Sequence, residues 1–208
     1  MVSLLTEGLD KLNLTYTQAQ LEKMNKFLDE IRLFNPIYKL VSYEDEDVLI
    51  IKHFLDCLAA VNVIKENLKE GILADLGSGG GFPGILLAIM LEDNEIYLVE
   101  RMKRRVDFLN NVVLACGLKN VHIIQEDIKA IDKQFDLITC RAFHPIYDII
   151  EDVDRLLKED GLFCAYKGRK SYIAAELENI KKFKANIVDL KVPFLDESRS
   201  MCILSRGC

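Results

Sequence analysis

A glycine-rich stretch between two apolar segments constrains this chain more than any other part of its sequence. Four glycines fall within residues 77–81, which follow an apolar run at 72–74 and precede another at 85–91. This pattern predicts a strand, a glycine turn and a helix. Glycine has no side chain, so such a turn lets the backbone pass close beneath a ligand. A tight turn that binds nothing is the weaker alternative, because so many glycines beside the carboxylate of Asp75 are rarely needed for a bare turn.

The glycine spacing separates two kinds of nucleotide-binding loop. A dinucleotide-binding loop reads G-x-G-x-x-G, and its third glycine, counted from Gly77, would fall on Phe82. The pattern that fits is D-x-G-x-G-x-G over residues 75–81, which resembles loops that bind S-adenosylmethionine. This interpretation assigns four residues to the cofactor site: Asp75, Gly77, Gly79 and Gly81. The Asp75 carboxylate either orients the loop amides or faces the amino group of the methionine moiety through water.

Composition places the chain among soluble globular proteins, with enough of its 208 residues for one α/β domain and an appendage. Its six cysteines form no C-x-x-C pair and lie mostly in apolar runs, so we expect reduced core thiols and no metal site. No apolar run approaches the ~20 residues that cross a bilayer, and no signal peptide is visible, so a cytoplasmic protein without membrane contact is expected. The net charge of −6 argues mildly against indiscriminate nucleic-acid binding but allows a local basic patch.

Residues 1–70 are expected to form a mostly helical extension. Thr17 and Gln20 resemble a capping box, and the apolar residues after them recur at helical spacing up to Pro36, which is expected to end that helix. A run of acidic residues favours the start of another helix. The expected helices cover residues 4–12, 18–34 and 46–59.

From residue 71 onward, strands and helices alternate, which implies a parallel, doubly wound α/β sheet. The expected strands are 71–76, 95–100, 121–125, 135–140 and 161–167, and the expected helices are 83–91, 102–116, 145–158 and 171–183. Two further strand-like runs, 186–192 and 200–205, are joined by too short a link for a crossover, so they suit an antiparallel hairpin. This arrangement resembles the Rossmann-like class I S-adenosylmethionine methyltransferase fold. Residues 71–208 would form that domain, in a single compact unit with the helical extension.

Acidic residues end the second and third expected strands, at the sheet edge where ligands of such folds bind. Glu100 can accept hydrogen bonds from both ribose hydroxyls of a nucleoside, or it is only a charge near a helix start. Asp127 can accept a hydrogen bond from an adenine amino group, or it is an ordinary loop charge. Gly77 and Arg141 are expected at the same edge.

The segment Asp75–Gly84 resembles the D-[IV]-G-[ST]-G-x-G-[FL]-P-G signature of the small-subunit ribosomal RNA guanine-N7 methyltransferase G family, also called glucose-inhibited division protein B. Three shorter segments resemble the family in the same order. His53–Asp56 resembles an H-x-x-D-S helix, with Cys57 in place of serine, Arg141–Phe143 resembles R-A-F, and Lys167–Gly168 resembles K-G. The chain departs from the family elsewhere: it lacks N-L-T before the second helix and an arginine-containing R-A-E after the third strand.

The resemblance implies methyl transfer from S-adenosylmethionine to N7 of one guanine in 16S ribosomal RNA, either free or in the small ribosomal subunit. The cofactor contacts that it implies are Gly77, Phe82, Ile128, Lys129 and Arg141, with Glu100 at the ribose. N7 carries a free lone pair, so the reaction needs no general base. Alignment of the reacting atoms would supply most of the rate, an effect that reaches about 7–11 kcal/mol in ideal cases.

Arg141 and Lys167 are the catalytic candidates, because a basic side chain can hold guanine O6 or a phosphate and leave N7 free. Their alternatives are an ion pair for Arg141 and a solvated strand end for Lys167. His53 and Asp56 lie three positions apart on one helical face, where a structural hydrogen-bonding role is favoured over a place at the pocket mouth. The basic residues that can form an RNA-facing rim are Arg101, Lys103, Arg104, Arg105, Lys167, Arg169 and Lys170.

Two aromatic residues are candidates for contact with RNA. Phe143 and Tyr166 can stack on a splayed RNA base, although core packing is commoner for such residues.

Two other functions remain open on sequence grounds. The same fold also serves methyltransferases of small metabolites, and the net charge slightly favours that class. A non-enzymatic module that binds NAD or an adenosine nucleotide is the third class, and Phe82 counts against NAD.

Overall fold

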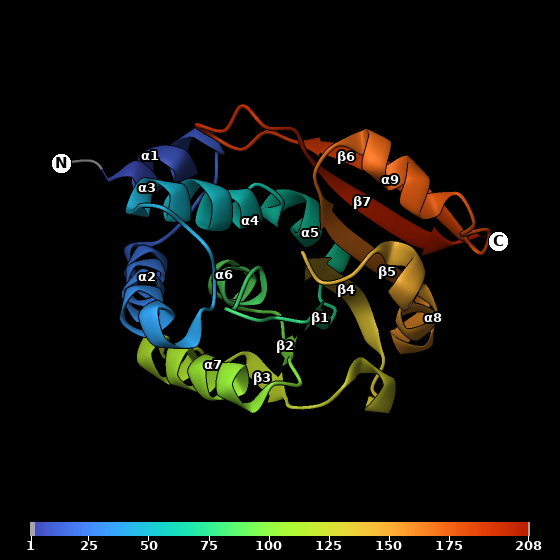
Figure 1. Ribbon diagram of the computed structural model, residues 1–208, viewed down its shortest axis with the longest axis horizontal. Coiled ribbons are helices and arrows are strands. Elements are labelled where there is room, and N and C mark those ends of the chain that lie inside the picture. The colour runs from blue at the N-terminus through green and yellow to red at the C-terminus, as the bar shows by residue number, and fades with distance from the viewer. Residues whose placement is uncertain (1–2, 208) are drawn as a thin grey trace.

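The computed structural model describes residues 3–207 as one seven-stranded sheet with helices on both faces (Figure 1). The strands are β1 (Leu73–Leu76), β2 (Ile96–Val99), β3 (Val121–Ile124), β4 (Phe135–Arg141), β5 (Leu157–Lys167), β6 (Phe183–Leu190) and β7 (Arg199–Arg206). Their order is β3-β2-β1-β4-β5-β7-β6, with β1 to β5 parallel and β7 antiparallel to both of its neighbours. The expected mostly parallel sheet with a terminal hairpin is confirmed.

The helices are α1 (Leu4–Lys11), α2 (Gln18–Tyr38), α3 (Glu46–Leu49), α4 (Asp56–Leu58), α5 (Val61–Leu68), α6 (Gly84–Met90), α7 (Lys103–Cys116), α8 (Ile146–Leu156) and α9 (Lys170–Leu177). A π-helical segment, Ile50–Leu55, joins α3 to α4, so the expected helix at 46–59 is one run with a widened middle. A short 3₁₀ turn covers Ile128–Ala130. The sequence did not single out α5.

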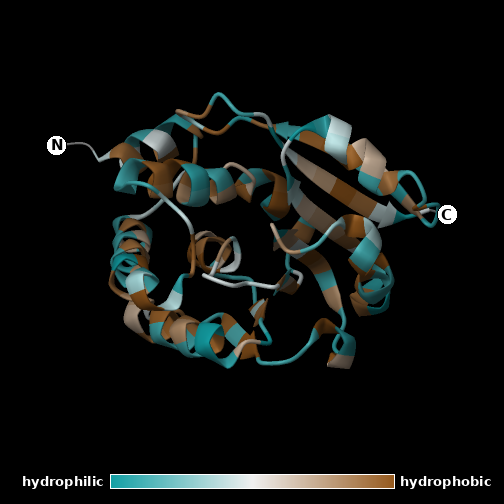
Figure 2. Ribbon diagram, in the orientation of Figure 1, coloured by the Kyte–Doolittle hydropathy of each residue, from teal (hydrophilic) through white to brown (hydrophobic). Residues whose placement is uncertain are grey.

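Hydrophobic residues on the two faces of the sheet form two separate clusters. Alternate residues point to opposite faces of a strand, so Leu73 joins one cluster and Ala74 the other. The first cluster also takes in α1 to α7, and the second takes in α8 and Ile173 of α9. Hydrophobic residues are concentrated in the central strands and in α6 (Figure 2). The N-terminal helices therefore share a core with the sheet, and the division of the chain at residue 70 stays a prediction.

The helix α2 continues past the expected stop at Pro36 and ends at Tyr38. Proline at position 36 has no N–H to donate to the carbonyl oxygen of Arg32, so the helix continues for two residues with one hydrogen bond fewer. The end is set instead by Lys39, which adopts the left-handed conformation (φ 52°), and by Asn35. The Asn35 Oδ1 atom accepts hydrogen bonds from the N–H groups of Leu40 and Val41, at 2.8 and 3.0 Å. The expected Thr17–Gln20 capping box is present.

Within residues 3–207, no helix is both long and apolar enough to cross a bilayer. The five cysteines in this range are buried free thiols: Cys57, Cys116, Cys140, Cys164 and Cys202. Cys208, which the sequence analysis grouped with them, lies outside the described residues.

Candidate active site

The glycine turn joins β1 to α6 and needs glycine at two positions for steric reasons. Gly77 (φ +70°) and Gly81 (φ +89°) both adopt backbone conformations that L-residues rarely take. A Cβ atom on Gly77 would lie 2.1 Å from Cδ2 of Phe143, and one on Gly81 would lie 2.7 Å from Cγ1 of Ile85. The Phe143 ring therefore packs directly on the backbone at Gly77.

Asp75 is fully buried behind the turn and holds it in place. Its Oδ2 atom accepts a hydrogen bond from the N–H of Gly84 at 3.0 Å, and the Ser78 hydroxyl donates to its backbone carbonyl at 2.9 Å. Burial raises the pKa of the Asp75 carboxyl to about 7. Its Oδ1 atom has no hydrogen-bond partner among residues 3–207. These contacts favour the first of its two sequence interpretations, orientation of the loop amides.

Glu100 follows β2 and binds the turn from the other side. Its Oε2 atom accepts a hydrogen bond from the N–H of Gly79 at 3.1 Å, and its Oε1 atom accepts one from the N–H of Met102 at 2.8 Å. The guanidinium of Arg105 lies 3.5 Å from Oε2. Glu100 is only 4% exposed, so its carboxylate is fixed between the glycine turn and the start of α7.

A cavity of about 650 Å³, here called the first cavity, opens beside the turn at the carboxyl ends of the strands. Its volume is typical of small-molecule sites. Five of the expected cofactor residues line it: Gly77, Glu100, Asp127, Ile128 and Lys129. Asp127 also caps the 3₁₀ turn, because its Oδ1 atom accepts from the N–H of Lys129 at 3.1 Å. The sheet edge thus brings these residues together as the strand pattern predicted.

Four other expected cofactor residues do not line this cavity: Asp75, Gly79, Gly81 and Phe82. Phe82 is buried, and its ring centroid lies 5.0 Å from that of Phe27 and 5.4 Å from that of Phe54. A large apolar ring next to a core of phenylalanines is more stable buried than at a wet pocket. The sequence pattern could not show this, because Phe27 and Phe54 come from the N-terminal helices.

A second cavity of about 460 Å³ lies next to the first and shares the segment Ala142–His144 with it. Its wall carries Arg141, Tyr166, Lys167 and Arg199. The expected Arg141 therefore lines this second cavity rather than the first. The shared segment therefore borders both cavities, and within it Ala142 has a positive φ of 50°.

The guanidinium of Arg141 forms an ion pair with Asp56, which was the alternative to a catalytic role in the sequence analysis. Its Nη1 atom donates to Oδ2 of Asp56 at 2.9 Å and to the carbonyl oxygen of Lys52 at 3.0 Å. The other carboxylate oxygen of Asp56 accepts from Nε of Arg199 at 3.0 Å. Asp56, which is 5% exposed, thus bridges two arginines on the wall of the second cavity.

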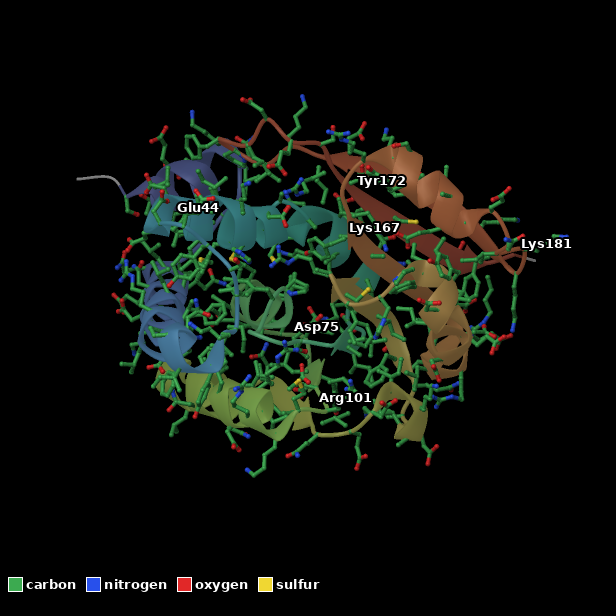
Figure 3. The ribbon with its side chains drawn as sticks, viewed as in Figure 1. Glu44, Asp75, Arg101, Lys167, Tyr172 and Lys181 are labelled. Atoms are coloured by element: carbon green, nitrogen blue, oxygen red, sulfur yellow. The ribbon has the colours of Figure 1, made fainter. Side chains whose placement is uncertain are left out.

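Lys167 is not a solvated strand end. Its Nζ atom donates to Oε2 of Glu176 at 2.6 Å, and the same oxygen accepts from the N–H of Ile146 at 2.6 Å. The side chains of Lys167 and Glu176 are 15% and 19% exposed. Lys167 and Arg101 lie on opposite sides of Asp75 in the view of Figure 3.

Most of the expected basic rim is engaged in local contacts. Lys103 pairs with Asp107 at 2.8 Å, and Lys170 pairs with Asp189 at 2.8 Å. Arg104 lies 5.9 Å from the centroid of the Tyr38 ring. Of the two aromatic candidates, Phe143 lines both cavities. Tyr166 lines only the second, is 6% exposed and donates to the carbonyl oxygen of Cys57 at 2.9 Å, so it packs as a core residue.

Sequence reasoning missed Arg199 and Glu176. Arg199 begins β7, and the pairing of Lys167 with Ser200 brings that position beside the end of β5. The expected hairpin was the signal that could have placed Arg199 at the site, but it did not say which strand the hairpin pairs with. No local motif marks Glu176.

The fold is that of the S-adenosylmethionine-dependent methyltransferases. A solved structure described as a SAM-dependent methyltransferase from Aquifex aeolicus superposes with a TM-score of 0.59 at 19% identity, over 77% of this chain and 94% of that one. The site agrees with this class, because an acid ends β2 beside a glycine turn of the D-x-G-x-G-x-G type.

The comparison with sequence families is more specific. The family model for rRNA small subunit methyltransferase G matches residues 20–202. The Ribosomal RNA small subunit methyltransferase G of Acinetobacter baumannii is 33% identical over 97% of this chain and 96% of its own length. The protein of the same name from Borrelia turicatae is 30% identical over 92% of each chain. The chain therefore belongs to the rRNA small subunit methyltransferase G family.

Proposed function

We propose that this protein transfers a methyl group from S-adenosylmethionine to N7 of one guanine in 16S ribosomal RNA, in the cytoplasm. The observation that carries the proposal is the pair of adjoining cavities at the carboxyl edge of the sheet. The first is bordered by the glycine turn and by acids that include Glu100 and Asp127. The second is bordered by Arg141, Lys167 and Arg199, and both share Ala142–His144. A donor in the first cavity and an acceptor in the second would both contact that segment and so lie next to each other.

The residues of the first cavity fit the cofactor. Gly77 leaves room at the turn, and Glu100 presents a buried carboxylate that can accept hydrogen bonds from ribose hydroxyls. Asp127, Ile128 and Lys129 border the other end, where an adenine ring would lie. When bound, S-adenosylmethionine supplies a methyl group on a positively charged sulfur. Asp75, Gly79, Gly81 and Phe82 then act indirectly, by fixing the shape of the turn.

The residues of the second cavity suit a purine with an exposed oxygen. Guanine presents O6 beside N7, and both are hydrogen-bond acceptors. Arg141 and Lys167 can donate to O6 or to a neighbouring phosphate, which would leave the lone pair of N7 free. No side chain has to remove a proton before the transfer, so positioning of the base is the main task of this cavity.

The metabolite and NAD-binding alternatives lose support. The curated relatives that match nearly the whole chain are named for ribosomal RNA. The RNA substrate is supported by family membership rather than by surface charge, since most basic residues near the site are paired.

A tritiated-methyl transfer assay tests the proposal with three acceptors: naked 16S ribosomal RNA, intact small subunits and a panel of small metabolites. We expect incorporation into RNA from cells that lack the protein, and cleavage at a single new site after borohydride and aniline treatment. RNA from cells that contain the protein should already carry the modification. Label in metabolites alone, or no new cleavage site, would contradict the proposal.

A further inference from the structure

Three acceptors from one helical segment surround the guanidinium of Arg141. They are the carbonyl oxygen of Lys52 at 3.0 Å, Nδ1 of His53 at 2.8 Å and Oδ2 of Asp56 at 2.9 Å. The segment is the π-helical run that passes into α4. π-Helical turns are rare and occur often at functional sites.

The hydrogen bonds of His53 define its tautomer. Its Nε2 atom lies 3.1 Å from the carbonyl oxygen of Ser42, and a carbonyl can only accept, so Nε2 carries the proton. The Nδ1 atom is then the acceptor for Nη2 of Arg141. Burial and the neighbouring guanidinium lower the pKa of His53 to about 4, so the ring is neutral at physiological pH. His53 is therefore a fixed acceptor and not a second cation.

These contacts leave part of the guanidinium uncommitted. An arginine has five N–H donors in a planar fork. Within residues 3–207, the Nε atom of Arg141 is buried without a hydrogen-bond partner, and one Nη2 hydrogen is also unused. A buried donor without a partner is costly, and such donors in native sites call for an explanation. The Nε atom is buried, but the side chain of Arg141 is 16% exposed and lines the second cavity, so an acceptor bound there can approach the unused Nη2 donor.

Asp56 extends the arrangement to a second arginine. Both of its oxygens are engaged, one by Arg141 and one by Arg199, and it is 5% exposed. Because a buried carboxylate shared by two guanidinium groups fixes the orientation of both, the wall of the second cavity is preorganised. The ring of Phe82 packs against His53 at a centroid distance of 5.4 Å and supports it from the core.

We propose that His53 and Asp56 are positioning residues for methyl transfer, which fix Arg141 so that its unused Nη2–H donor meets the acceptor oxygen of the guanine substrate. This role rests on the proposed function. The sequence analysis favoured a structural role for His53 and Asp56. Their contacts with Arg141 instead assign both residues to the site.

Two substitutions of His53 distinguish its role as a hydrogen-bond acceptor for Arg141 from its packing against Phe82. His53→Leu keeps an apolar side chain against Phe82 but removes the acceptor, whereas His53→Asn keeps an acceptor oxygen near the position of Nδ1. We expect kcat for 16S ribosomal RNA to fall about tenfold or more in His53→Leu, because Arg141 is misplaced, and to recover substantially in His53→Asn. Affinity for S-adenosylhomocysteine should stay unchanged in both, because His53 does not line the first cavity. Asp47→Ala, an exposed change on the same helical run, is the matched control.

A second readout does not depend on activity. In protein labelled with ¹⁵N-arginine, the restrained Nη protons of Arg141 should give separate signals that average in His53→Leu and persist in His53→Asn. Unchanged kcat and unchanged Arg141 signals in His53→Leu would overturn the proposal, as would an equal loss of kcat in both variants. If the wild-type protein methylates no ribosomal RNA, the proposed function fails instead, and the arginine signals still report whether His53 fixes Arg141.

Discussion

At the scale of single residues, two buried carboxylates hold the glycine turn from opposite sides and with different chemistry. Asp75 binds the N–H of Gly84 and keeps one oxygen without a partner among the described residues. Glu100 binds two backbone N–H groups, one from Gly79 and one from Met102. Burial with a single backbone hydrogen bond to its side chain favours the protonated form of the Asp75 carboxyl, so its pKa is raised.

The pKa of Asp75 gives a stability test. Its carboxyl titrates at about 7 in the folded protein against an ordinary value of 3.8, so between these values the folded state binds more protons than the unfolded one. Its contribution to stability is therefore present at low pH and is lost as the pH rises through 7. In Asp75→Asn the amide keeps an acceptor for Gly84 and does not titrate. We expect the Tm of this variant, relative to wild type, to rise between pH 5 and pH 8.

Thermal melts by circular dichroism at the two pH values measure this difference. His53, whose pKa of about 4 lies below its ordinary 6.5, has the opposite effect, but it is present in both proteins and cancels. A Tm difference that does not change with pH would show that Asp75 does not titrate in this range.

Glu100→Gln should weaken cofactor binding. The amide replaces one acceptor oxygen by a donor, which then faces a backbone N–H or a ribose hydroxyl. Loss of a hydrogen bond to a charged group costs about 1.5–3 kcal/mol. We therefore expect the Kd for S-adenosylhomocysteine to rise about 10- to 150-fold, as measured by calorimetry. The exposed Glu66→Gln, which lines neither cavity, serves as the control; equal affinities of the two variants would remove Glu100 from the cofactor site.

At the scale of elements, the end of α2 affects the glycine turn from outside the sheet. Lys39 turns the chain, and the next residues run across the turn at Gly80. A Cβ atom on Gly80 would lie 3.3 Å from Cβ of Leu40 and 3.3 Å from Cγ1 of Val41. Since Asn35 binds the N–H groups of these two residues, this one amide side chain couples the N-terminal helices to the turn.

Removal of that cap tests the coupling. Asn35→Ala leaves two partly buried N–H groups without their acceptor, and we expect the free energy of unfolding to fall by about 1–2 kcal/mol. Urea denaturation monitored by circular dichroism gives the value. Asn62→Ala, on an exposed face of α5, is the matched control and should not destabilise the protein. If both variants have the same midpoint, Asn35 does not stabilise this junction.

At the scale of the whole molecule, the charged side chains of residues 3–207 do not form a broad basic surface that would attract RNA of any sequence. The chain carries a net charge of −6, and many of its cations are paired on the surface. Examples are Lys103 with Asp107, Lys170 with Asp189, and Lys52 with Glu197. A protein of this kind neutralises few phosphates when it binds.

This distribution predicts a shallow salt dependence of RNA binding. The slope of log K against log salt concentration is about −0.7 to −0.9 for each phosphate contacted. With few free cations near the site, we expect a slope shallower than about −3 for small subunits or 16S ribosomal RNA. Filter binding between low and moderate potassium chloride measures it. A slope as steep as that of a protein with a broad basic surface would mean that many of these ion pairs open on binding.

Local pattern was enough for much of the fold and for part of the site. The strand, turn and helix around residues 72–91, the parallel sheet and the terminal hairpin all follow from apolar periodicity and from the short link at 193–199. Because parallel strands end at one edge, the sequence also placed Gly77, Glu100 and Asp127 together. The predicted end of α2 at Pro36 was wrong, because the helix continues to Tyr38 and the Asn35 side chain caps the residues that follow.

What the amino-acid sequence determined by itself was therefore the backbone plan and the set of residues at the edge of the sheet, because steric preference and hydrophobic periodicity act between near neighbours in the chain. Only the tertiary structure decided which side chains meet: Asp56 with Arg141 and Arg199, Lys167 with Glu176, and Phe82 with the phenylalanines of the N-terminal helices. Most of these partners lie far apart in the chain, and their contacts depend on strand register and helix packing, which no local pattern encodes.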